Sequence, residues 1–218
     1  MKPIAHIRTD FQEKFGIPRQ SGLVPGLVGR IVFLPAYRNP DALRGLDGYS
    51  HIWLLWEFSE AKRETWSPTV RPPRLGGNRR MGVFATRSPF RPNPIGLSCV
   101  RLLGIEGTDL VVEGADLLDG TPIYDIKPYL PYTDAHPEAT AGFAGEVYED
   151  RLTVEFPAAL LSKLPPDKRE SVIALLRGDP RPSYQEDAAR VYGMPYAGFD
   201  IRFTVAGDAL TVIAVEKI

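Results

Sequence analysis

The 218-residue chain has a formal net charge of −1, with 24% charged and 44% hydrophobic residues. This composition excludes a disordered or fibrous protein and predicts a globular one, with one large domain or one domain plus a small appendage. No run of eighteen apolar residues is present, so no membrane span is expected. The single Cys99 excludes an internal disulfide and, without a visible signal peptide, favours a reducing, cytoplasmic setting.

Strand-like segments follow one another closely through the first part of the chain. The predicted strands cover residues 2–8, 29–34, 49–58, 81–85, 97–105, 110–115 and 122–126. One helical turn fits at residues 39–46, behind Pro40, and Asp119-Gly120 is a strong turn dipeptide. Such short spacing predicts an antiparallel sheet or barrel rather than alternating βαβ units.

Two of these early segments carry candidate ligand groups. In the polar loop at residues 11–22, Arg19 and Gln20 are equally compatible with ligand contacts and with a solvated connection. The aromatic run at residues 49–58 predicts a strand buried on both faces. His51 stands at its start, beside Ser50, and could contact a ligand, although residue chemistry alone favours a core histidine with satisfied hydrogen bonds.

Residues 71–101 form the most distinctive stretch of the chain. They contain seven arginines and no lysine, and no acidic residue occurs between Glu64 and Glu106. The planar guanidinium fork matches phosphate and carboxylate oxygens, so an all-arginine set indicates oriented contacts with an anion. Proline and glycine make residues 71–80 a loop and residues 87–94 a rigid turn, which favours a preorganised site over a merely solvated loop.

A second polar group accompanies the strand predicted from residue 122 onward. Strict alternation would place Ile123, Asp125 and Lys127 on one face of that strand. Two interpretations stay open for Asp125 and Lys127. They could form an ordinary ion pair at a sheet edge, or an acid that handles a proton beside a charge that orients it.

The end of the chain predicts a small α+β unit. A connector rich in Ala, Gly and Pro covers residues 132–147, and a boundary is expected near residues 145–150. A strand at 152–156 and a short helix at 157–164 follow. A better helix is predicted at 167–177, with Asp167 as N-cap and Gly178 just past its end. Residues 199–205 and 209–215 predict a terminal hairpin.

Several common catalytic signals are missing from the sequence. There is no dinucleotide-binding glycine motif, no P-loop and no nucleophile elbow, and the three histidines and one cysteine lack metal-ligand spacing, so no metal site is expected. From residue chemistry alone we infer a β-rich protein with a rigid, arginine-bearing site for a phosphate- or carboxylate-containing ligand, and no particular reaction.

Five motifs extend this interpretation. They are FGIPRQ at 15–20, LDGYSHIW at 46–53, the long segment RPPRLGGNRRMGVFATRSPFRPNPIGLS at 71–98, DGTPIYDIKPY at 119–129 and DPRPSY at 179–184. With these motifs the chain resembles the TsaA-like family of S-adenosylmethionine-dependent tRNA methyltransferases. Members methylate N6 of threonylcarbamoyladenosine beside the anticodon.

The resemblance implies a fold that is mainly β, α+β overall. Residues 1–147 would form an N-terminal antiparallel β-barrel that binds S-adenosylmethionine, and residues 148–218 a small C-terminal α+β domain. It also implies a homodimer with the cofactor near the subunit interface. The implied cofactor contacts are Pro18, Arg19, Gln20, Ser50, His51, Arg87, Leu97, Asp116, Leu117, Asp119, Gly120, Thr121 and Pro122. Arg19 or Arg87 would hold the cofactor carboxylate, and Asp116 or Asp119 its amine or ribose.

For the chemistry, we expect Asp125 to take the proton or orient the N6–H group, with Lys127 and Tyr129 positioning it. Anticodon-loop phosphates of the tRNA would be held by Arg79, Arg80, Arg91 and Arg181. Two other functions stay open. They are a methyltransferase acting on another acceptor, since fold and cofactor do not fix the substrate, and a non-catalytic RNA-binding β-barrel.

Overall fold

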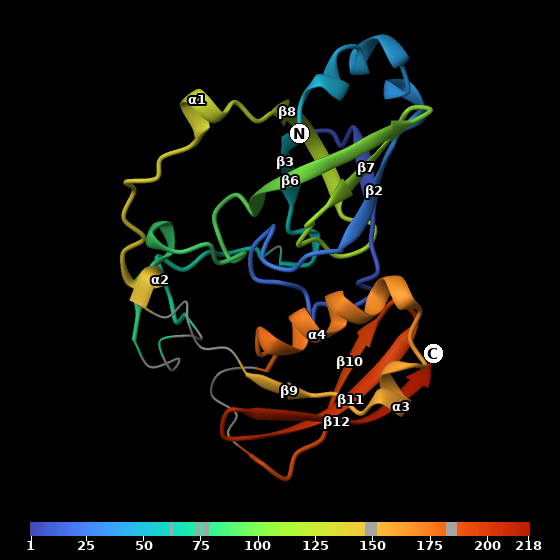
Figure 1. Ribbon diagram of the computed structural model, residues 1–218. Coiled ribbons are helices and arrows are strands. Elements are labelled where there is room, and N and C mark those ends of the chain that lie inside the picture. The colour runs from blue at the N-terminus through green and yellow to red at the C-terminus, as the bar shows by residue number, and fades with distance from the viewer. Residues whose placement is uncertain (62, 73–74, 76–78, 147–151, 182–186) are drawn as a thin grey trace.

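The computed structural model describes residues 1–61, 63–72, 75, 79–146, 152–181 and 187–218 (Figure 1). The first part of the chain forms a barrel, and the last part forms a sheet covered by helix α4 (Arg169–Arg177) (Figure 1). The predicted boundary between residues 147 and 148 lies outside the described residues. No helix of the described part is long and apolar enough to cross a bilayer.

Six strands close into the antiparallel barrel that the family resemblance implies, so the expected fold class is confirmed. They are β1 (Ala5–Arg8), β2 (Val28–Phe33), β3 (His51–Glu57), β6 (Ile95–Glu106), β7 (Asp109–Glu113) and β8 (Pro122–Pro128). Their order is β1-β2-β7-β6-β3-β8, and β8 pairs with β1 to complete the ring. Closure leaves no unpaired edge, and one face of every strand is available for an apolar interior.

Burial along β3 corrects the expectation of a strand buried on both faces. Ile52, Leu54 and Trp56 point into the barrel core and are 0–5% exposed, whereas the residues between them are only half-buried. The reason is that a closed barrel has a single interior, so the outer side chains of β3, including Trp53 and Leu55, are covered only in part.

The segment between β3 and β6 is mostly irregular. It holds a two-stranded ribbon, β4 (Thr69–Val70) and β5 (Met81–Gly82). The strand predicted at 81–85 ends at Gly82, and Val83–Ala85 form a 3₁₀ turn. The turn forms because the backbone N–H and the Oγ1 of Thr86 both donate to the carbonyl of Val83, at 3.2 and 2.9 Å, which diverts that carbonyl from a strand ladder. Part of the predicted loop 71–80 lies outside the described residues.

The C-terminal part is a four-stranded sheet with helices against it. Its strands are β9 (Thr153–Glu155), β10 (Tyr192–Tyr196), β11 (Phe199–Ala206) and β12 (Ala209–Lys217), in the order β10-β11-β12-β9. The terminal hairpin of β11 and β12 is confirmed. Strand β10 was not predicted, because Gly193 and Pro195 interrupt its alternation. The short helix α3 (Ala158–Leu161) packs against β12, whereas α1 (Pro131–Asp134) and α2 (Phe143–Glu146) lie in the connector after β8 (Figure 1).

Helix α4 (Arg169–Arg177) starts and ends differently from the sequence prediction. A 3₁₀ turn at Pro166–Lys168 leads into it, so Lys168 rather than Asp167 is its N-cap residue. At the other end Gly178 is the C-cap with φ −73°, and Asp179 takes the left-handed conformation with φ 48°. Aspartate is among the side chains that tolerate this region.

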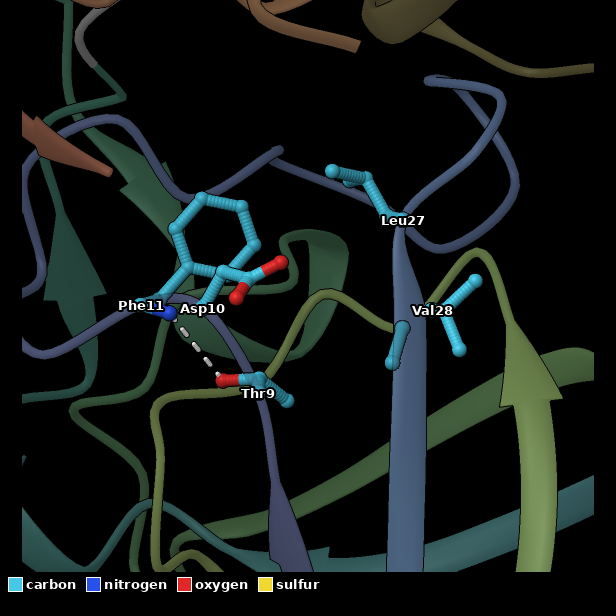
Figure 2. A pocket seen from close by; sticks show the side chains of 6 residues that line it. Thr9, Asp10, Phe11, Leu27 and Val28 are labelled. Carbon is cyan, nitrogen blue, oxygen red and sulfur yellow. Dashed lines mark hydrogen bonds between the residues drawn. The ribbon is translucent and has the colours of Figure 1, made fainter. Parts of the chain in front are cut away.

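The loop between β1 and β2, residues 9–27, packs into the C-terminal part. Its apolar side chains Phe11, Val24 and Leu27 are buried in the core beneath α4 and the sheet. The rings of Phe11 and Tyr196 lie 5.5 Å apart. Figure 2 shows the crevice where this loop leaves the barrel, beside Phe11 and Leu27; it has no room for a water molecule.

Polar contacts anchor the same loop to α4 and to the 3₁₀ turn that precedes it. The Nζ of Lys168 lies 2.6 Å from Oδ2 of Asp10, and Ser171 Oγ donates to the carbonyl of Pro25 at 3.0 Å. A Cβ on Gly16 would meet the Met194 side chain at 2.6 Å, and Gly16 has φ +90°, so glycine is required there. The loop is therefore held to the C-terminal part on both sides of the motif at 18–20.

Candidate functional site

A groove at the rim of the barrel gathers residues from distant parts of the sequence. It passes from the 9–27 loop across the start of β6 and over the outer faces of Trp53 and Cys99. The predicted cofactor residues that line it are Pro18, Arg19, Gln20, Arg87, Leu97, Asp116 and Thr121. Three predicted RNA-binding residues, Arg80, Arg91 and Arg181, line it as well.

Asp116 is the carboxylate that a buried hydrogen-bond relay holds at this groove. Trp56 Nε1–H donates to Ser98 Oγ at 2.9 Å, and Ser98 lies 2.5 Å from Asp116 Oδ1. Because the indole nitrogen can only donate, the hydroxyl proton of Ser98 must point to Asp116. Ser98 is 0% exposed. Sequence reasoning did not assign roles to Trp56 or Ser98; the available signal was a serine on the apolar, inward-facing side of β6.

Burial and hydrogen bonding act in opposite directions on this carboxyl. Burial raises the pKa of Asp116 above its ordinary value, while the hydrogen bond from Ser98 and the charge of Arg87 oppose the rise. A carboxylate so placed has few water contacts and interacts strongly with a cationic ligand group. Gly96 leaves room for the relay, since a Cβ there would lie 2.2 Å from the Trp56 ring.

Arg87 connects the rigid turn to the motif at residues 18–20. Its Nη1 donates to Oε1 of Gln20, and Gln20 Nε2 donates to the carbonyl of Arg19. Arg91 stiffens the same turn from within, because its Nη1 donates to the carbonyl of Thr86 at 2.8 Å. The guanidinium and amide groups beside Asp116 are thus held in place before a ligand arrives.

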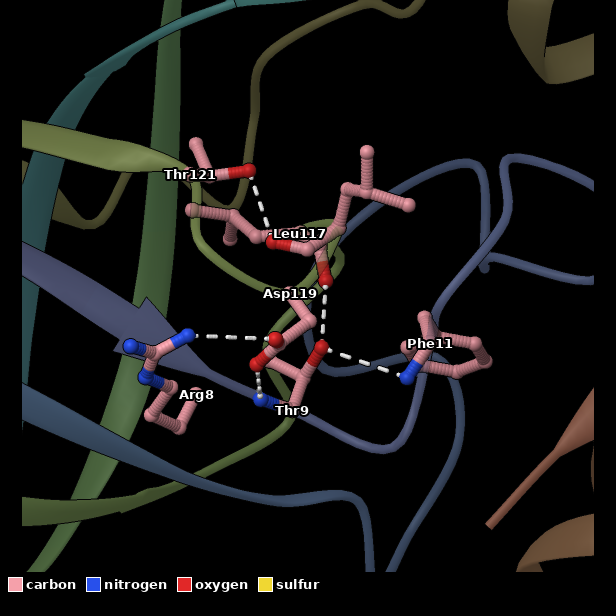
Figure 3. Close-up of polar contacts among 7 residues, drawn as sticks. Arg8, Thr9, Phe11, Leu117, Asp119 and Thr121 are labelled. Atoms are coloured by element: carbon pink, nitrogen blue, oxygen red, sulfur yellow. Dashed lines mark hydrogen bonds and ion pairs between the residues drawn. The ribbon is translucent and has the colours of Figure 1, made fainter. Parts of the chain in front are cut away.

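Asp119 has a different environment from Asp116 (Figure 3). Its Oδ1 accepts the backbone N–H of Thr9 at 3.0 Å, and its Oδ2 lies 3.3 Å from Nη1 of Arg8. Thr9 Oγ1 in turn donates to the carbonyl of Leu117 at 3.0 Å. Asp119 therefore ties the start of the 9–27 loop to the barrel, and of the two acids offered for the cofactor amine or ribose, Asp116 is the one at the groove.

The other predicted residues of segment 117–122 serve the barrel itself. Leu117 is fully buried in its core, and Gly120 makes the turn before β8 with φ +77°. Pro122 stands opposite His6 where β8 closes onto β1. These three residues do not line the groove.

Ser50, His51 and Tyr129 meet at the far end of β3. Ser50 Oγ lies 2.9 Å from His51 Nδ1, and Tyr129 N–H donates to the carbonyl of His51 at 3.0 Å. The Tyr129 ring lies 6.2 Å from that of His51 and 5.7 Å from that of Trp53. Leu97 pairs with Leu55, four residues from His51, which corresponds to about 14 Å along the strand.

Asp125 and Lys127 form an ion pair on the outside of the barrel. Lys127 Nζ lies 2.9 Å from Asp125 Oδ2, and the two side chains are 62% and 46% exposed. The expectation that Ile123 shares their face is wrong. A bulge shifts the register of β8, so that Leu55 pairs with Asp125 but Trp56 pairs with Ile123, and Ile123 turns into the core.

The predicted RNA-binding arginines differ in their surroundings. Arg79 and Arg80 are exposed beside the β4–β5 ribbon. Arg181 is 12% exposed and makes a two-pronged ion pair with Asp179, Nε and Nη2 each lying 2.9 Å from a carboxylate oxygen. Among the described residues, no three His, Cys, Asp or Glu side chains converge as a metal site would require.

The fold and the groove define a β-barrel protein with a preorganised, arginine-rich candidate ligand site. Comparison with known proteins identifies it further. The model of the tRNA-methyltransferase O N-terminal domain matches residues 6–135, and that of the TrmO C-terminal domain matches residues 149–218. The chain belongs to the tRNA-methyltransferase O family.

Similar proteins are known in several bacteria. The tRNA (adenine(37)-N6)-methyltransferase of Escherichia coli is 41% identical over 225 residues, covering 98% of this chain and 96% of that protein. The putative S-adenosylmethionine-dependent methyltransferase RcsF of Pseudomonas aeruginosa is 43% identical, covering 93% of this chain and 91% of its own. The crystal structure of TrmO from Pseudomonas aeruginosa superposes with a TM-score of 0.79 at 37% identity, covering 98% of this chain and 96% of that one.

Proposed function

We propose that this protein is a tRNA methyltransferase that transfers a methyl group from S-adenosylmethionine to N6 of the adenine beside the anticodon. The observation that carries the proposal is the 41% identity, over 98% of the chain, with the E. coli enzyme named for this reaction on adenine 37. We further propose that the adenine bears the threonylcarbamoyl group, which the resemblance of the five motifs to the TsaA-like family implies. The setting is the cytoplasm, because tRNA is the substrate.

The groove has the chemistry that S-adenosylmethionine requires. The cofactor supplies an electrophilic methyl group on a sulfonium, and also carries a carboxylate, an amine and an adenine. Arg19 or Arg87 would hold the carboxylate, and the half-buried Asp116 would hold the amine or the ribose hydroxyls. Gln20 would fix the Arg87 fork, since the two side chains are already hydrogen-bonded. Leu97, 57% exposed at the rim, would cover an apolar part of the cofactor.

A homodimer would bring the remaining predicted residues to the site. Within one copy, Ser50 and His51 lie about 14 Å along β3 from the position of Leu97. Leu55, Trp53, Cys99 and Leu97 form an apolar strip on the same outer face of β3 and β6. Leu97 is exposed and the other three are half-buried. Partly exposed apolar strips of this kind mark interfaces, so a second copy packed here would place its own Ser50 and His51 near the groove. Analytical ultracentrifugation of wild type and Leu97→Glu tests this arrangement.

Proton handling is assigned to Asp125. The N6 lone pair is delocalised into the ring, so N6 is a weak nucleophile. Transfer of the methyl group turns the sulfonium into a neutral thioether and leaves N6 positively charged, so N6 must lose its proton during or after transfer. Asp125, oriented by its ion pair with Lys127, would accept that proton or orient the N6–H group, with Tyr129 positioning the acceptor. Asp125→Asn should lower turnover at least tenfold with little change in Tm, because the side chain is on the barrel exterior. Unchanged turnover in a folded Asp125→Asn variant would remove this role.

Phosphates of the anticodon loop would be bound by the arginines. Arg79 and Arg80 are exposed and suited to direct contact. Arg91 and Arg181 also line the groove, and each already holds a partner, the carbonyl of Thr86 and the carboxylate of Asp179. We propose that these two arginines attract the phosphates by their positive charge, from positions that their existing contacts fix.

Transfer from labelled S-adenosylmethionine to tRNA with and without the threonylcarbamoyl group tests the proposal. Incorporation only into modified tRNA is expected. Incorporation into unmodified tRNA or into another molecule would leave a methyltransferase with a different acceptor. Failure to bind S-adenosylmethionine, measured by calorimetry, would favour a non-catalytic RNA-binding barrel.

A further inference from the structure

Three aromatic side chains are exposed on the segment between β3 and β6. Phe84 is 74% exposed, Trp66 50% and Phe90 39%. The rings of Trp66 and Phe84 lie 6.1 Å apart and are inclined by 32°. We call these three residues the aromatic platform. Such rings are normally buried in large part, so their grouping on one surface segment indicates that something covers them.

Arginines outnumber acids on the segment that carries the platform, where the acids are Glu60 and Glu64. The Cζ of Arg63 lies 3.7 Å from the centre of the Phe90 ring, and that of Arg91 lies 6.0 Å from the centre of the Phe84 ring. Arg79 and Arg80 are exposed on the same segment, and its sequence has no acidic residue between Glu64 and Glu106. Flat apolar faces combined with an excess of guanidinium groups match a single-stranded nucleic acid, whose bases stack on rings and whose phosphates attract cations.

The backbone beneath Phe84 keeps its ring at the surface. Its neighbour Val83 is 1% exposed, and the Val83 N–H donates to the carbonyl of Pro68 at 2.9 Å, which also fixes the strand after Trp66. On the other side of the Val83–Ala85 turn, Arg91 Nη1 donates a hydrogen bond to the carbonyl of Thr86. The Phe84 ring therefore cannot fold inward without breaking these contacts, and the platform exists before RNA binds.

We infer that Trp66, Phe84 and Phe90 stack against unpaired bases of the RNA substrate while Arg79 and Arg80 contact the flanking phosphates. The inference rests on the proposed function in that the RNA is taken to be the anticodon loop. An adenine inside a stacked loop does not expose N6 to a cofactor, so its neighbours must be held apart from it. A second copy of the chain is a poorer occupant, because a two-fold contact would place this cationic segment against itself.

Phe84→Ala tests the inference, with Phe84→Tyr as the matched control that keeps a stacking ring. Binding of an anticodon stem-loop RNA is measured by fluorescence anisotropy over a range of salt concentrations. Phe84→Ala should weaken binding about 5- to 100-fold without changing the slope of log affinity against log salt, because no charge is lost. Phe84→Tyr should bind like wild type. Arg79→Ala should instead reduce the slope by about 0.7 to 0.9.

Fluorescence of Trp66 gives a second readout. Trp66 is the most exposed of the three tryptophans, so stacking should quench the emission of wild type on adding RNA, and Trp66→Phe should lose that change. Wild-type affinity of both Phe84→Ala and Trp66→Ala would overturn the inference. So would a shift of Phe84→Ala to a smaller sedimenting species, since the platform would then be a subunit contact.

The two proposals can fail separately. Methyl transfer by wild type to tRNA, combined with unaltered RNA binding by Phe84→Ala, removes the platform and leaves the proposed function. Weakened RNA binding by Phe84→Ala, in a wild type that transfers no methyl to tRNA, keeps the platform and removes the reaction. A wild-type protein that binds no RNA at all would overturn both.

Discussion

The hydrogen-bond relay of the buried Trp56 and Ser98 with the half-buried Asp116 gives a quantitative prediction. Ser98→Ala removes one oxygen that both accepts from Trp56 Nε1, at 2.9 Å, and donates to Asp116 Oδ1, at 2.5 Å. The indole N–H is left buried without its acceptor, which costs about 1–3 kcal/mol. Asp116 lies at the groove, where water can replace part of its lost bond. We therefore expect the free energy of unfolding to fall by about 2 kcal/mol.

For a chain of this size, that loss lowers Tm by roughly 4–8 °C. Thermal unfolding followed by circular dichroism measures it, and Trp56→Phe provides the matched variant, because it removes the donor and leaves Ser98 able to donate to Asp116. The double variant should lose less than the sum of the two single losses, since both act on one hydrogen bond. A Ser98→Ala protein within about 0.5 kcal/mol of wild type would refute the relay, because a replaced surface hydroxyl has an effect of that size.

Three further predictions concern the same region. Burial raises the pKa of Asp116 above the ordinary aspartate value of about 3.9. The affinity for S-adenosylmethionine should therefore fall as the pH drops through that raised pKa, because the carboxylate becomes protonated. Asp116→Asn should bind the cofactor about tenfold more weakly at pH 7 and lose this pH dependence. Gly96→Ala should lower the free energy of unfolding by about 1–3 kcal/mol, because its Cβ would lie 2.2 Å from the Trp56 ring. Lys168→Ala breaks the 2.6 Å contact with Asp10 and should lower the free energy of unfolding by about 1 kcal/mol. It should also weaken cofactor binding, because the 9–27 loop loses an anchor. Lys168→Arg should have a smaller effect on both quantities.

Each of these predictions has a result that contradicts it. A calorimetric titration in which wild type and Asp116→Asn show the same pH profile would mean that Asp116 does not contact the cofactor. A Gly96→Ala protein as stable as wild type would show that Trp56 can move. Loss of stability in Lys168→Ala without any change in cofactor affinity would separate the anchoring of the loop from the site.

An antiparallel sheet or barrel was predictable because the strand-like segments follow one another at short spacing, with turn residues between them. What the alternation could not reveal is the bulge in β8. One extra residue at this point turns Ile123 into the core while Asp125 and Lys127 stay outside, and nothing in the residues 122–127 themselves indicates it. Strand β10 was missed because Gly193 and Pro195 break the pattern that identifies strands.

The site was predictable as a set of motifs but not as an arrangement. The family resemblance implies that Arg87 and Asp116 belong to one ligand site, and both residues line the groove. The sequence does not indicate that Ser50 and His51 lie at the end of β3 away from Leu97. A motif shows which residues are adjacent in the chain, but not at which end of the barrel they lie. The contact of Ser98 with Trp56 joins two strands and depends on their register, which is a property of the whole sheet.

The most direct test of the central claim is the mass of the nucleosides in tRNA after reaction. Wild-type protein, S-adenosylmethionine carrying a trideuterated methyl group and tRNA containing threonylcarbamoyladenosine are incubated, and the tRNA is digested and analysed by mass spectrometry. The proposed function predicts that this one nucleoside gains the labelled methyl on N6, and that Asp116→Asn transfers it more slowly at limiting cofactor. Label on a different nucleoside, or none on any, would contradict it.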